Sequence, residues 1–177
     1  MIRITGGENR SRLLETPSTS LTKPTMDKVR AAVFSALGDS VKNATVLDLF
    51  AGSGSYGFEA LSRGAKHATF VDVSYDAITV IKKNAASLKR ENVEILNYDV
   101  LSFLHENSQE FDIVFADPPY KFEVYEDVVK TLIERKVIVD GGIIVLESER
   151  QLNIDESQFK SVRFYKYGLA KIYILRK

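Results

Sequence analysis

Two groups of residues have the types and spacing needed for chemistry on a bound ligand. The first is a G-x-G-x-x-G pattern formed by Gly52, Gly54 and Gly57, with Asp72 twenty positions after Gly52. Glycines let the backbone approach a ligand closely, and a carboxylate at this spacing accepts hydrogen bonds from ribose hydroxyls. The pattern predicts a cofactor that contains adenosine. Taken alone, it does not separate a nicotinamide dinucleotide from S-adenosylmethionine.

Asp48 favours S-adenosylmethionine as the cofactor. It lies inside an apolar run just before the glycines, in Asp48-Leu49-Phe50-Ala51-Gly52. A carboxylate there attracts the ammonium group of the methionine part of S-adenosylmethionine, whereas it would repel a pyrophosphate. We therefore expect Asp48, Phe50, Gly52, Gly54 and Asp72 to bind this cofactor.

The second group is Asp117-Pro118-Pro119-Tyr120, which follows a later apolar run. Ligands of an open α/β sheet bind beyond the carboxyl ends of its strands, so this group is expected to face the same crevice as the glycines. Consecutive prolines fix φ and donate no backbone hydrogen bond, which leaves carbonyl groups on a stiff turn.

This arrangement suits methyl transfer to an exocyclic amine of a nucleobase. The lone pair of such an amine is delocalised into the ring, so the nitrogen is a poor nucleophile. The Asp117 carboxylate and the Pro118 carbonyl can each accept one N–H, which directs the lone pair toward the methyl group. Tyr120 can stack on the base. Positioning then supplies most of the acceleration, and no metal is needed. The proton that leaves the nitrogen goes either to Asp117 or to water.

Three further residues are expected to surround the adenine. Asp99 follows a third apolar run and could accept from the adenine amine, with Val73 and Val100 on the two faces of the ring. For the two valines, a place in the ordinary core is nearly as plausible. The chain contains no cysteine, and neither of its two histidines has metal-ligand spacing.

These residues need a parallel sheet to bring them together. Apolar runs at 46–50, 68–71, 93–96, 112–116 and 143–147 alternate with helical patterns, and residues 161–167 and 170–175 read as a closing hairpin around Gly168. Such alternation predicts an α/β fold of the class I methyltransferase (Rossmann-like) type. We expect a mostly parallel seven-stranded sheet with an antiparallel C-terminal hairpin strand, plus a small N-terminal extension made of a β-hairpin and a helix.

The charge distribution suggests an RNA-facing arm. The net charge is zero, but residues 1–30 carry six basic and three acidic side chains. We divide the chain into a basic hairpin and linker at 1–24 and a methyltransferase domain at 25–177. The absence of a long apolar run and of a signal sequence predicts a cytoplasmic protein without membrane contact. The expected RNA-binding residues are Arg3, Arg10, Arg12, Lys23, Lys28 and Arg30.

Taken together, these motifs resemble those of the bacterial 16S ribosomal RNA guanine-N2 methyltransferases. The resemblance covers essentially the whole chain, and its most specific part runs from Lys23-Pro24-Thr25 through Asp27-Lys28-Val29-Arg30 to Phe34. It implies a methyl group placed on guanine 966 of the 16S ribosomal RNA, in an assembled small subunit, by what we expect to be a monomer. The chain departs from the family pattern at Ser11 (usually Gly), Lys23 (usually Arg) and Ala31 (usually acidic).

Three other functions remain open. A DNA adenine-N6 methyltransferase uses the same Asp-Pro-Pro-Tyr logic, but Gly52 to Asp117 leaves no room for an inserted recognition domain. A non-catalytic RNA-binding assembly factor is disfavoured by the intact Asp48, Asp72 and Asp117. A nicotinamide dehydrogenase is disfavoured by Asp48 and by the lack of an evident pair of proton-relay residues.

Overall fold

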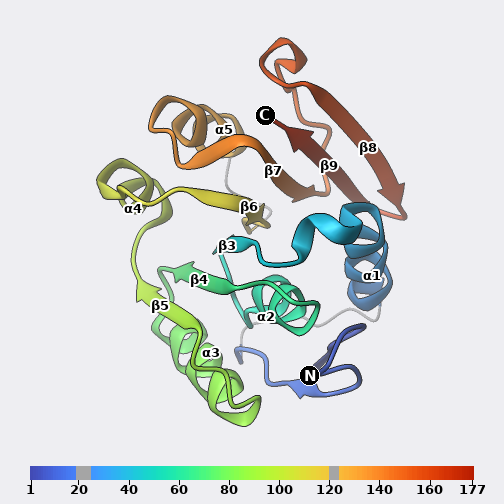
Figure 1. The fold of residues 1–177 in the computed structure, drawn as a ribbon, viewed down its shortest axis with the longest axis vertical. Coiled ribbons are helices and arrows are strands. Elements are labelled where there is room, and N and C mark those ends of the chain that lie inside the picture. Colours follow the sequence, from blue (N-terminus) through green and yellow to red (C-terminus); the bar gives the residue numbers. More distant parts are fainter. Residues whose placement is uncertain (19–24, 120–123) are drawn as a thin grey trace.

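The computed structural model describes residues 1–18, 25–119 and 124–177. Its centre is a seven-stranded sheet in the order β5-β4-β3-β6-β7-β9-β8 (Figure 1). The first five strands of that order run parallel, β9 is antiparallel to β7, and β8 is antiparallel to β9. The predicted α/β fold, a mostly parallel seven-stranded sheet with an antiparallel C-terminal hairpin, is therefore confirmed. The strands are β3 (Thr45–Leu49), β4 (His67–Asp72), β5 (Val93–Asn97), β6 (Phe111–Ala116), β7 (Ile138–Ser148), β8 (Ser161–Tyr167) and β9 (Ala170–Arg176).

Helices cover both faces of the sheet, as a parallel sheet requires. Two buried clusters separate them: one joins the sheet to α1, α2 and α3, and the other joins it to α4 and α5. Figure 1 shows α4 and α5 on one side of the sheet and α1 and α2 on the other. The helices are α1 (Thr25–Leu37), α2 (Ser55–Ser62), α3 (Tyr75–Ser87), α4 (Val100–Glu106) and α5 (Tyr125–Glu134), with 3₁₀ turns η1 (Gly38–Val41) and η2 (Glu156–Gln158).

Local sequence explains where the helices at the carboxyl edge begin. The Ser74 hydroxyl accepts from the Ala77 N–H and caps α3, and the Asp99 carboxylate accepts from the Ser102 N–H and caps α4. Such caps satisfy donors that the first turn leaves unpaired. β7 is longer than predicted: it begins at Ile138 rather than Ile143, and its pairing with β6 is irregular between Phe111 and Ile113.

The N-terminal hairpin is built from two very short strands. β1 (Ile2–Arg3) pairs with β2 (Leu13–Leu14), and a loop over residues 4–12 connects them. The loop lies against the end of α2: the Ser62 hydroxyl donates to the Gly6 carbonyl, and a Cβ on Gly7 would come within 1.8 Å of the Ser62 carbonyl oxygen. Glycine is needed there because the two backbones almost touch.

This hairpin is packed into the domain. Ile2, Ile4 and Leu14 are buried in the same cluster as α1 and α2. The expected boundary between residues 24 and 25 falls at the edge of segment 19–24, which lies outside the described residues. Among the described residues, no helix is long and apolar enough to span a membrane.

Candidate active site

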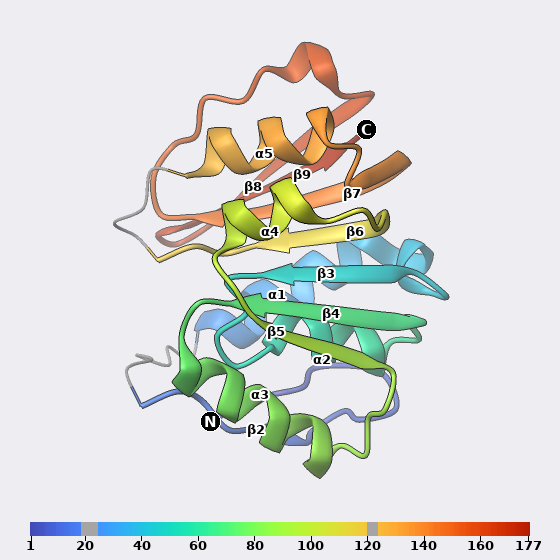
Figure 2. The same cartoon turned by 90° about the vertical axis from the view of Figure 1, so that its left-hand side faces the viewer.

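The glycine loop connects β3 to α2 at the carboxyl edge of the sheet. In Figure 2 the arrowheads of β3, β4 and β6 all point to this edge. Gly52 and Gly54 have positive φ values of 56° and 76°, which glycine adopts without steric cost. A Cβ on Gly54 would lie 2.7 Å from the Phe58 ring, whereas one on Gly52 would meet nothing closer than 3.9 Å. Gly54 therefore lets α2 pack closely, and Gly52 leaves open space where a ligand could approach.

Phe50 also has a positive φ, of 56°, one residue after β3 ends. For a side chain of this size the left-handed region is strained, and such strain clusters at functional sites. Its side chain is partly buried against the cluster under α4 and α5. The strained backbone turns the chain sharply from the strand into the glycine loop.

Asp72 ends β4 and holds the loop in place. Its Oδ2 accepts from the Gly52 N–H at 2.8 Å, and its Oδ1 accepts from the Ser74 N–H at 2.8 Å. A carboxylate oxygen accepts more than one hydrogen bond, so both oxygens keep capacity for ribose hydroxyls. The next residue, Val73, is 71% exposed, which is unusual for an apolar side chain at a sheet edge.

Asp48 is 3% exposed, and its Oδ2 accepts from the Gly57 N–H of α2 at 2.8 Å. Burial, together with the charge of the nearby Asp72, raises the pKa of Asp48 to about 8, against the opposing effect of that hydrogen bond. The sequence assigned Asp48 to the ammonium group of the cofactor. In the structure, this carboxylate is bonded to the first turn of the helix that follows the glycine loop.

The residues expected around adenine differ in accessibility. Asp99 is exposed, and one of its oxygens caps α4. Val100 is 3% exposed and belongs to the core cluster under α4 and α5. Only Val73, of the two valines, presents an open side chain to a ligand.

Asp117 follows β6, next to β3 in the sheet. Burial raises its pKa well above the usual range, and the nearby carboxylates of Glu147, Asp48 and Glu149 raise it further. Asp117 and Asp48 therefore lie close enough to repel each other, as expected if the two motifs share one crevice. Pro118 is buried, while Tyr120 lies outside the described residues.

This cluster also contains Glu147, Tyr56 and Tyr125. None of these three residues was predicted from the sequence. The Tyr56 hydroxyl donates to Oε2 of Glu147 at 2.6 Å, and the Tyr125 hydroxyl donates to the Glu147 carbonyl oxygen at 2.8 Å. The Tyr56 ring stacks on Phe115 with centroids 4.9 Å apart. One available signal was the position of Glu147 in the fifth expected strand, where it reaches the same sheet edge as Asp117.

The basic arm divides into exposed and buried residues. Arg3, Arg10, Arg12 and Lys28 are exposed. The Arg12 guanidinium donates to the Ser87 carbonyl at the end of α3, at 2.9 Å. Lys23 lies outside the described residues.

Arg30 does not face RNA as predicted. It is 2% exposed, and its Nε donates to the fully buried Glu59 at 3.2 Å. Burial alone would raise the pKa of Glu59, but hydrogen bonds from Thr5 and Arg63, together with the charge of Arg30, lower it. A buried, paired guanidinium neutralises Glu59 and is unavailable to a phosphate. Arg30 therefore joins α1 to α2 and the N-terminal hairpin.

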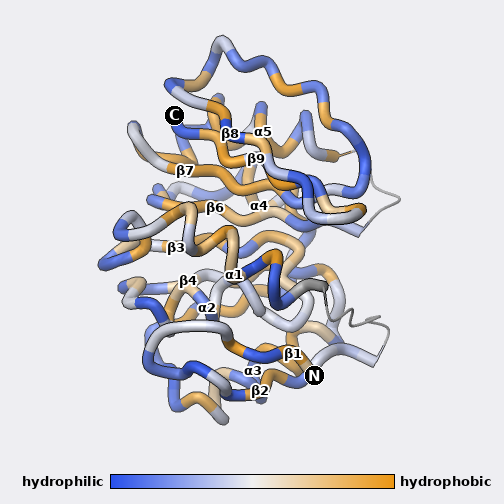
Figure 3. Tube along the Cα trace, turned by 90° about the vertical axis from the view of Figure 1, so that its right-hand side faces the viewer, coloured by the Kyte–Doolittle hydropathy of each residue, from blue (hydrophilic) through white to orange (hydrophobic). Residues whose placement is uncertain are grey.

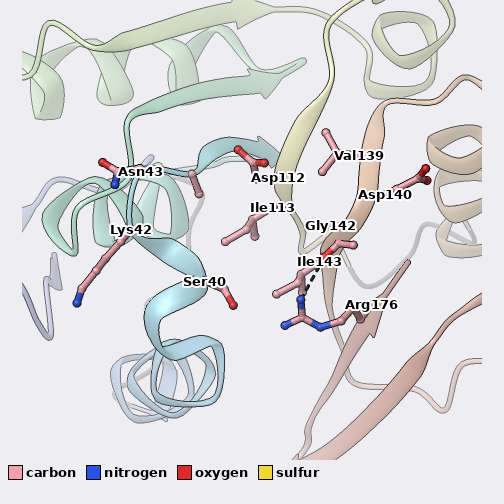
Figure 4. A pocket seen from close by; sticks show the side chains of 12 residues that line it. Ser40, Lys42, Asn43, Asp112, Ile113, Val139, Asp140, Gly142, Ile143 and Arg176 are labelled. Atoms are coloured by element: carbon pink, nitrogen blue, oxygen red, sulfur yellow. Dashed lines mark hydrogen bonds between the residues drawn. The ribbon is translucent and has the colours of Figure 1, made fainter.

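A hollow of about 240 Å³ lies at the opposite edge of the sheet (Figure 4). Its charged groups are engaged within the protein: Asp112 accepts from Thr45, and Arg176 donates to the Gly141 carbonyl. It lies at the amino ends of β3 and β6, away from the glycine loop. In the portion of the chain that the structure covers, no group of His, Cys, Asp and Glu side chains is arranged to hold a metal.

Comparison with known proteins decides the family. The family model described as "Conserved hypothetical protein 95" matches residues 2–176. The chain is 38% identical to Ribosomal RNA small subunit methyltransferase D of Escherichia coli K12, over 84% of this chain and 75% of that one. It is 33% identical to Putative rRNA methyltransferase YlbH of Bacillus subtilis, over 99% of both.

The chain belongs to the family described as "Conserved hypothetical protein 95". A solved structure described as putative methyltransferase yhhF from Escherichia coli superposes with a TM-score of 0.89 at 33% identity, covering 99% of this chain and 97% of that chain. The resemblance to bacterial methyltransferases of small-subunit ribosomal RNA is thereby confirmed. One departure from the family pattern now has a structural setting: Ser11 has a φ of 71°, a left-handed conformation that the family's usual glycine adopts more easily.

Proposed function

We propose that the chain transfers a methyl group from S-adenosylmethionine to the exocyclic N2 amine of a guanine in small-subunit ribosomal RNA, the guanine numbered 966. The observation that carries the proposal is the strand register that places Asp48 of β3 opposite Phe115 of β6, two residues before Asp117 and its Asp-Pro-Pro-Tyr motif. The names of the relatives, which act on ribosomal RNA of the small subunit, support the substrate class.

The described residues fit the proposed cofactor. Gly52 leaves open space beside a carboxylate that can accept from ribose, and the exposed Val73 offers an apolar surface for adenine. Bound S-adenosylmethionine would supply an electrophilic methyl group on a sulfonium.

The carboxylates suit a cationic ligand. Burial raises the pKa of Asp48, of Asp117 and of Glu147, and a neighbouring carboxylate raises each of them further. A positive charge nearby favours the ionised form of a carboxylate. We expect cofactor binding to ionise Asp117, which turns it into the hydrogen-bond acceptor that the target amine requires.

Asp117 then orients the target nitrogen. Its carboxylate accepts one N–H and the Pro118 carbonyl accepts the other, so the nitrogen lone pair points toward the methyl group. Tyr120 stacks on the base, which holds the amine in line. The proton released from nitrogen passes to Asp117 or to water. The hydrogen bond from Tyr56 holds the Glu147 side chain at the same edge of the sheet. A second carboxyl group therefore lies beside Asp117.

The substrate is tested by incubating the protein with radiolabelled S-adenosylmethionine and one of three acceptors. These are small ribosomal subunits from a strain lacking the enzyme, naked 16S RNA, and duplex DNA. We expect label in the small subunits and much less in naked RNA, because a small domain with few phosphate contacts binds free RNA weakly. Label in duplex DNA at an equal rate would move the protein to the adenine-N6 class.

A further inference from the structure

The C-terminal hairpin is rich in basic and aromatic residues. From Ser157 to Lys177 the chain carries six lysines and arginines and no aspartate or glutamate. Four aromatic residues lie among them, namely Phe164, Tyr165, Tyr167 and Tyr173. Basic residues interleaved with aromatic ones are typical of surfaces that bind single-stranded nucleic acid. The basic residues are Lys160, Arg163, Lys166, Lys171, Arg176 and Lys177.

The end of β8 lies at the same edge of the sheet as the candidate active site. β9 is antiparallel to β7 and β8 is antiparallel to β9, so β8 runs in the direction of β6 and β7. Ile172 of β9 pairs with Glu147 on one side and with Tyr165 on the other. From β6 to β8 there are three strand spacings, which is about 14 Å. In Figure 2 the β8–β9 turn lies at the edge toward which β3, β4 and β6 point.

The two tyrosines of β8 share a face of the sheet. Paired residues of neighbouring strands point to the same face, so Tyr165 lies on the face of Ile172 and Glu147. Tyr165 and Tyr167 stack on each other, with centroids 6.4 Å apart and planes inclined by 16°. Both are partly exposed and border the cluster under α1. Figure 3 shows β8 and α1 on this side of the molecule.

Lys166 lies between the two tyrosines in the chain, so its side chain projects from the opposite face of β8, which is the edge strand of the sheet. Lys166 of β8 pairs directly with Lys171 of β9. Like charges opposite each other destabilise a sheet, so this pair adds nothing to the pairing of β8 with β9. Lys171 donates to the Glu149 carbonyl oxygen, while Lys166 is exposed. Lys166 and Lys171 therefore place positive charge at the end of the hairpin that is nearest the active site.

We propose that Arg163, Tyr165, Lys166 and Tyr167, here called the β8 rim, bind the RNA strand that flanks the target nucleotide. Bases stack on the two tyrosines, and the basic side chains contact phosphates. The inference rests on the proposed function and adds a second RNA surface, on the far side of α1 from the N-terminal hairpin. A second copy of the chain pairing along β8 is disfavoured, because exposed Lys and Arg on an edge strand oppose edge-to-edge association.

The tyrosines are tested by binding of a fluorescein-labelled single-stranded RNA, followed by fluorescence anisotropy. Replacing both by alanine (Tyr165→Ala with Tyr167→Ala) should weaken RNA binding at least about fivefold, because the stacking surface is lost. The matched double phenylalanine variant keeps the rings and should bind within about twofold of wild type. Affinity for S-adenosylhomocysteine should not change in either variant. Equal RNA binding by the alanine variant and wild type would overturn the proposal.

The charge is tested by Lys166→Ala, an exposed substitution that does not threaten folding. It should weaken RNA binding and lower the slope of log affinity against log salt by about 1. Lys160, which precedes β8 at the opposite edge, provides the control. Lys160→Ala should leave the slope unchanged, and an equal effect of both variants would contradict a localised surface. A change in oligomeric state on gel filtration after Lys166→Ala would assign the rim to a second copy instead.

Kinetics separate this proposal from the proposed function. With small subunits as substrate, Lys166→Ala should raise KM and leave kcat within about twofold, because the rim lies away from the reacting atoms. If wild-type protein methylates no guanine, the proposed function fails. If wild type is active and every β8 rim variant matches it in KM and RNA affinity, only the rim proposal fails.

Discussion

The Tyr56 hydroxyl donates a 2.6 Å hydrogen bond to the Glu147 carboxylate, and this bond joins the glycine loop to the far side of the candidate active site. Tyr56 is the second residue of α2, while Glu147 is the penultimate residue of β7, across β3 and β6. Burial and the charge of Glu147 raise the pKa of Tyr56 well above its usual value, so the hydroxyl remains a donor at neutral pH. The two halves of the site are thus held in one geometry.

Tyr56→Phe should destabilise the protein while preserving the aromatic stack on Phe115. Hydrogen bonds to charged groups contribute about 1.5–3 kcal/mol, which corresponds to a fall in Tm of about 3–12 °C for a chain of this length. Tyr125→Phe is the control: it removes a bond to the neutral carbonyl of Glu147 and should cost less. Calorimetric melting that showed Tyr56→Phe to be as stable as wild type would remove the bridge from the account.

Asp72→Ala should lower affinity for S-adenosylhomocysteine at least about tenfold, measured by titration calorimetry. The variant loses the acceptor proposed for ribose and also the bonds that hold Gly52 and Ser74. Asp76→Ala is the matched control, because this exposed carboxylate accepts from Ser18 and lies outside the proposed cofactor site. An Asp72→Ala variant with wild-type affinity, or tight binding of NAD by the wild type, would contradict the cofactor assignment.

Stability should fall between about pH 4 and about pH 8, partly because of Asp48. The pKa of Asp48 is about 8 in the folded state, against 3.8 for an unperturbed aspartate. In this window the unfolded chain has released the proton and the folded chain retains it, so rising pH favours unfolding. Asp48→Asn keeps an acceptor for the Gly57 N–H and removes the titration. Chemical denaturation should show a smaller loss from pH 5 to pH 8 in the variant, and identical losses would refute the assignment.

The N-terminal arm should act on RNA and not on the cofactor. We expect Arg10→Ala combined with Arg12→Ala to cut methylation of small subunits by an order of magnitude or more, with unchanged affinity for S-adenosylhomocysteine. Both side chains are exposed, and phosphate contacts of this kind position an enzyme on its substrate. Lys42→Ala, at the opposite edge of the sheet, is the control. Full activity in the double variant would reduce the arm to a structural hairpin.

The fold was predictable because its signals are local. The apolar run at 46–50, the glycine loop and the cap at Ser74 each determine one element with little help from the rest of the chain. Residues of the site that act through distant partners were harder to find. Arg30 looked like an exposed base because its partner Glu59 is far along the sequence, on another helix. Tyr56 lies on α2, which follows β3, and Glu147 lies on β7. The two side chains meet only once β6 has paired with both of these strands.

The positions of individual side chains on the surface could not be predicted from the local sequence either. Lys166 and Lys171 become a like-charged pair only through the register of β8 with β9. Likewise, Val73 and Val100 look equivalent in sequence, yet one is open and the other is core, because α4 begins at Val100 and buries it. Tertiary packing determines both the strand register and the exposure of these side chains. A local sequence pattern carries no information on either.

The central claim is methylation of a guanine amine positioned by Asp117. Its most direct test is nucleoside mass spectrometry of 16S RNA taken from small subunits after reaction with wild type or with Asp117→Ala. We predict N2-methylguanine from the wild type and none from Asp117→Ala, while both proteins bind S-adenosylhomocysteine with similar affinity. N6-methyladenine in place of N2-methylguanine, or wild-type yield from Asp117→Ala, would contradict the account.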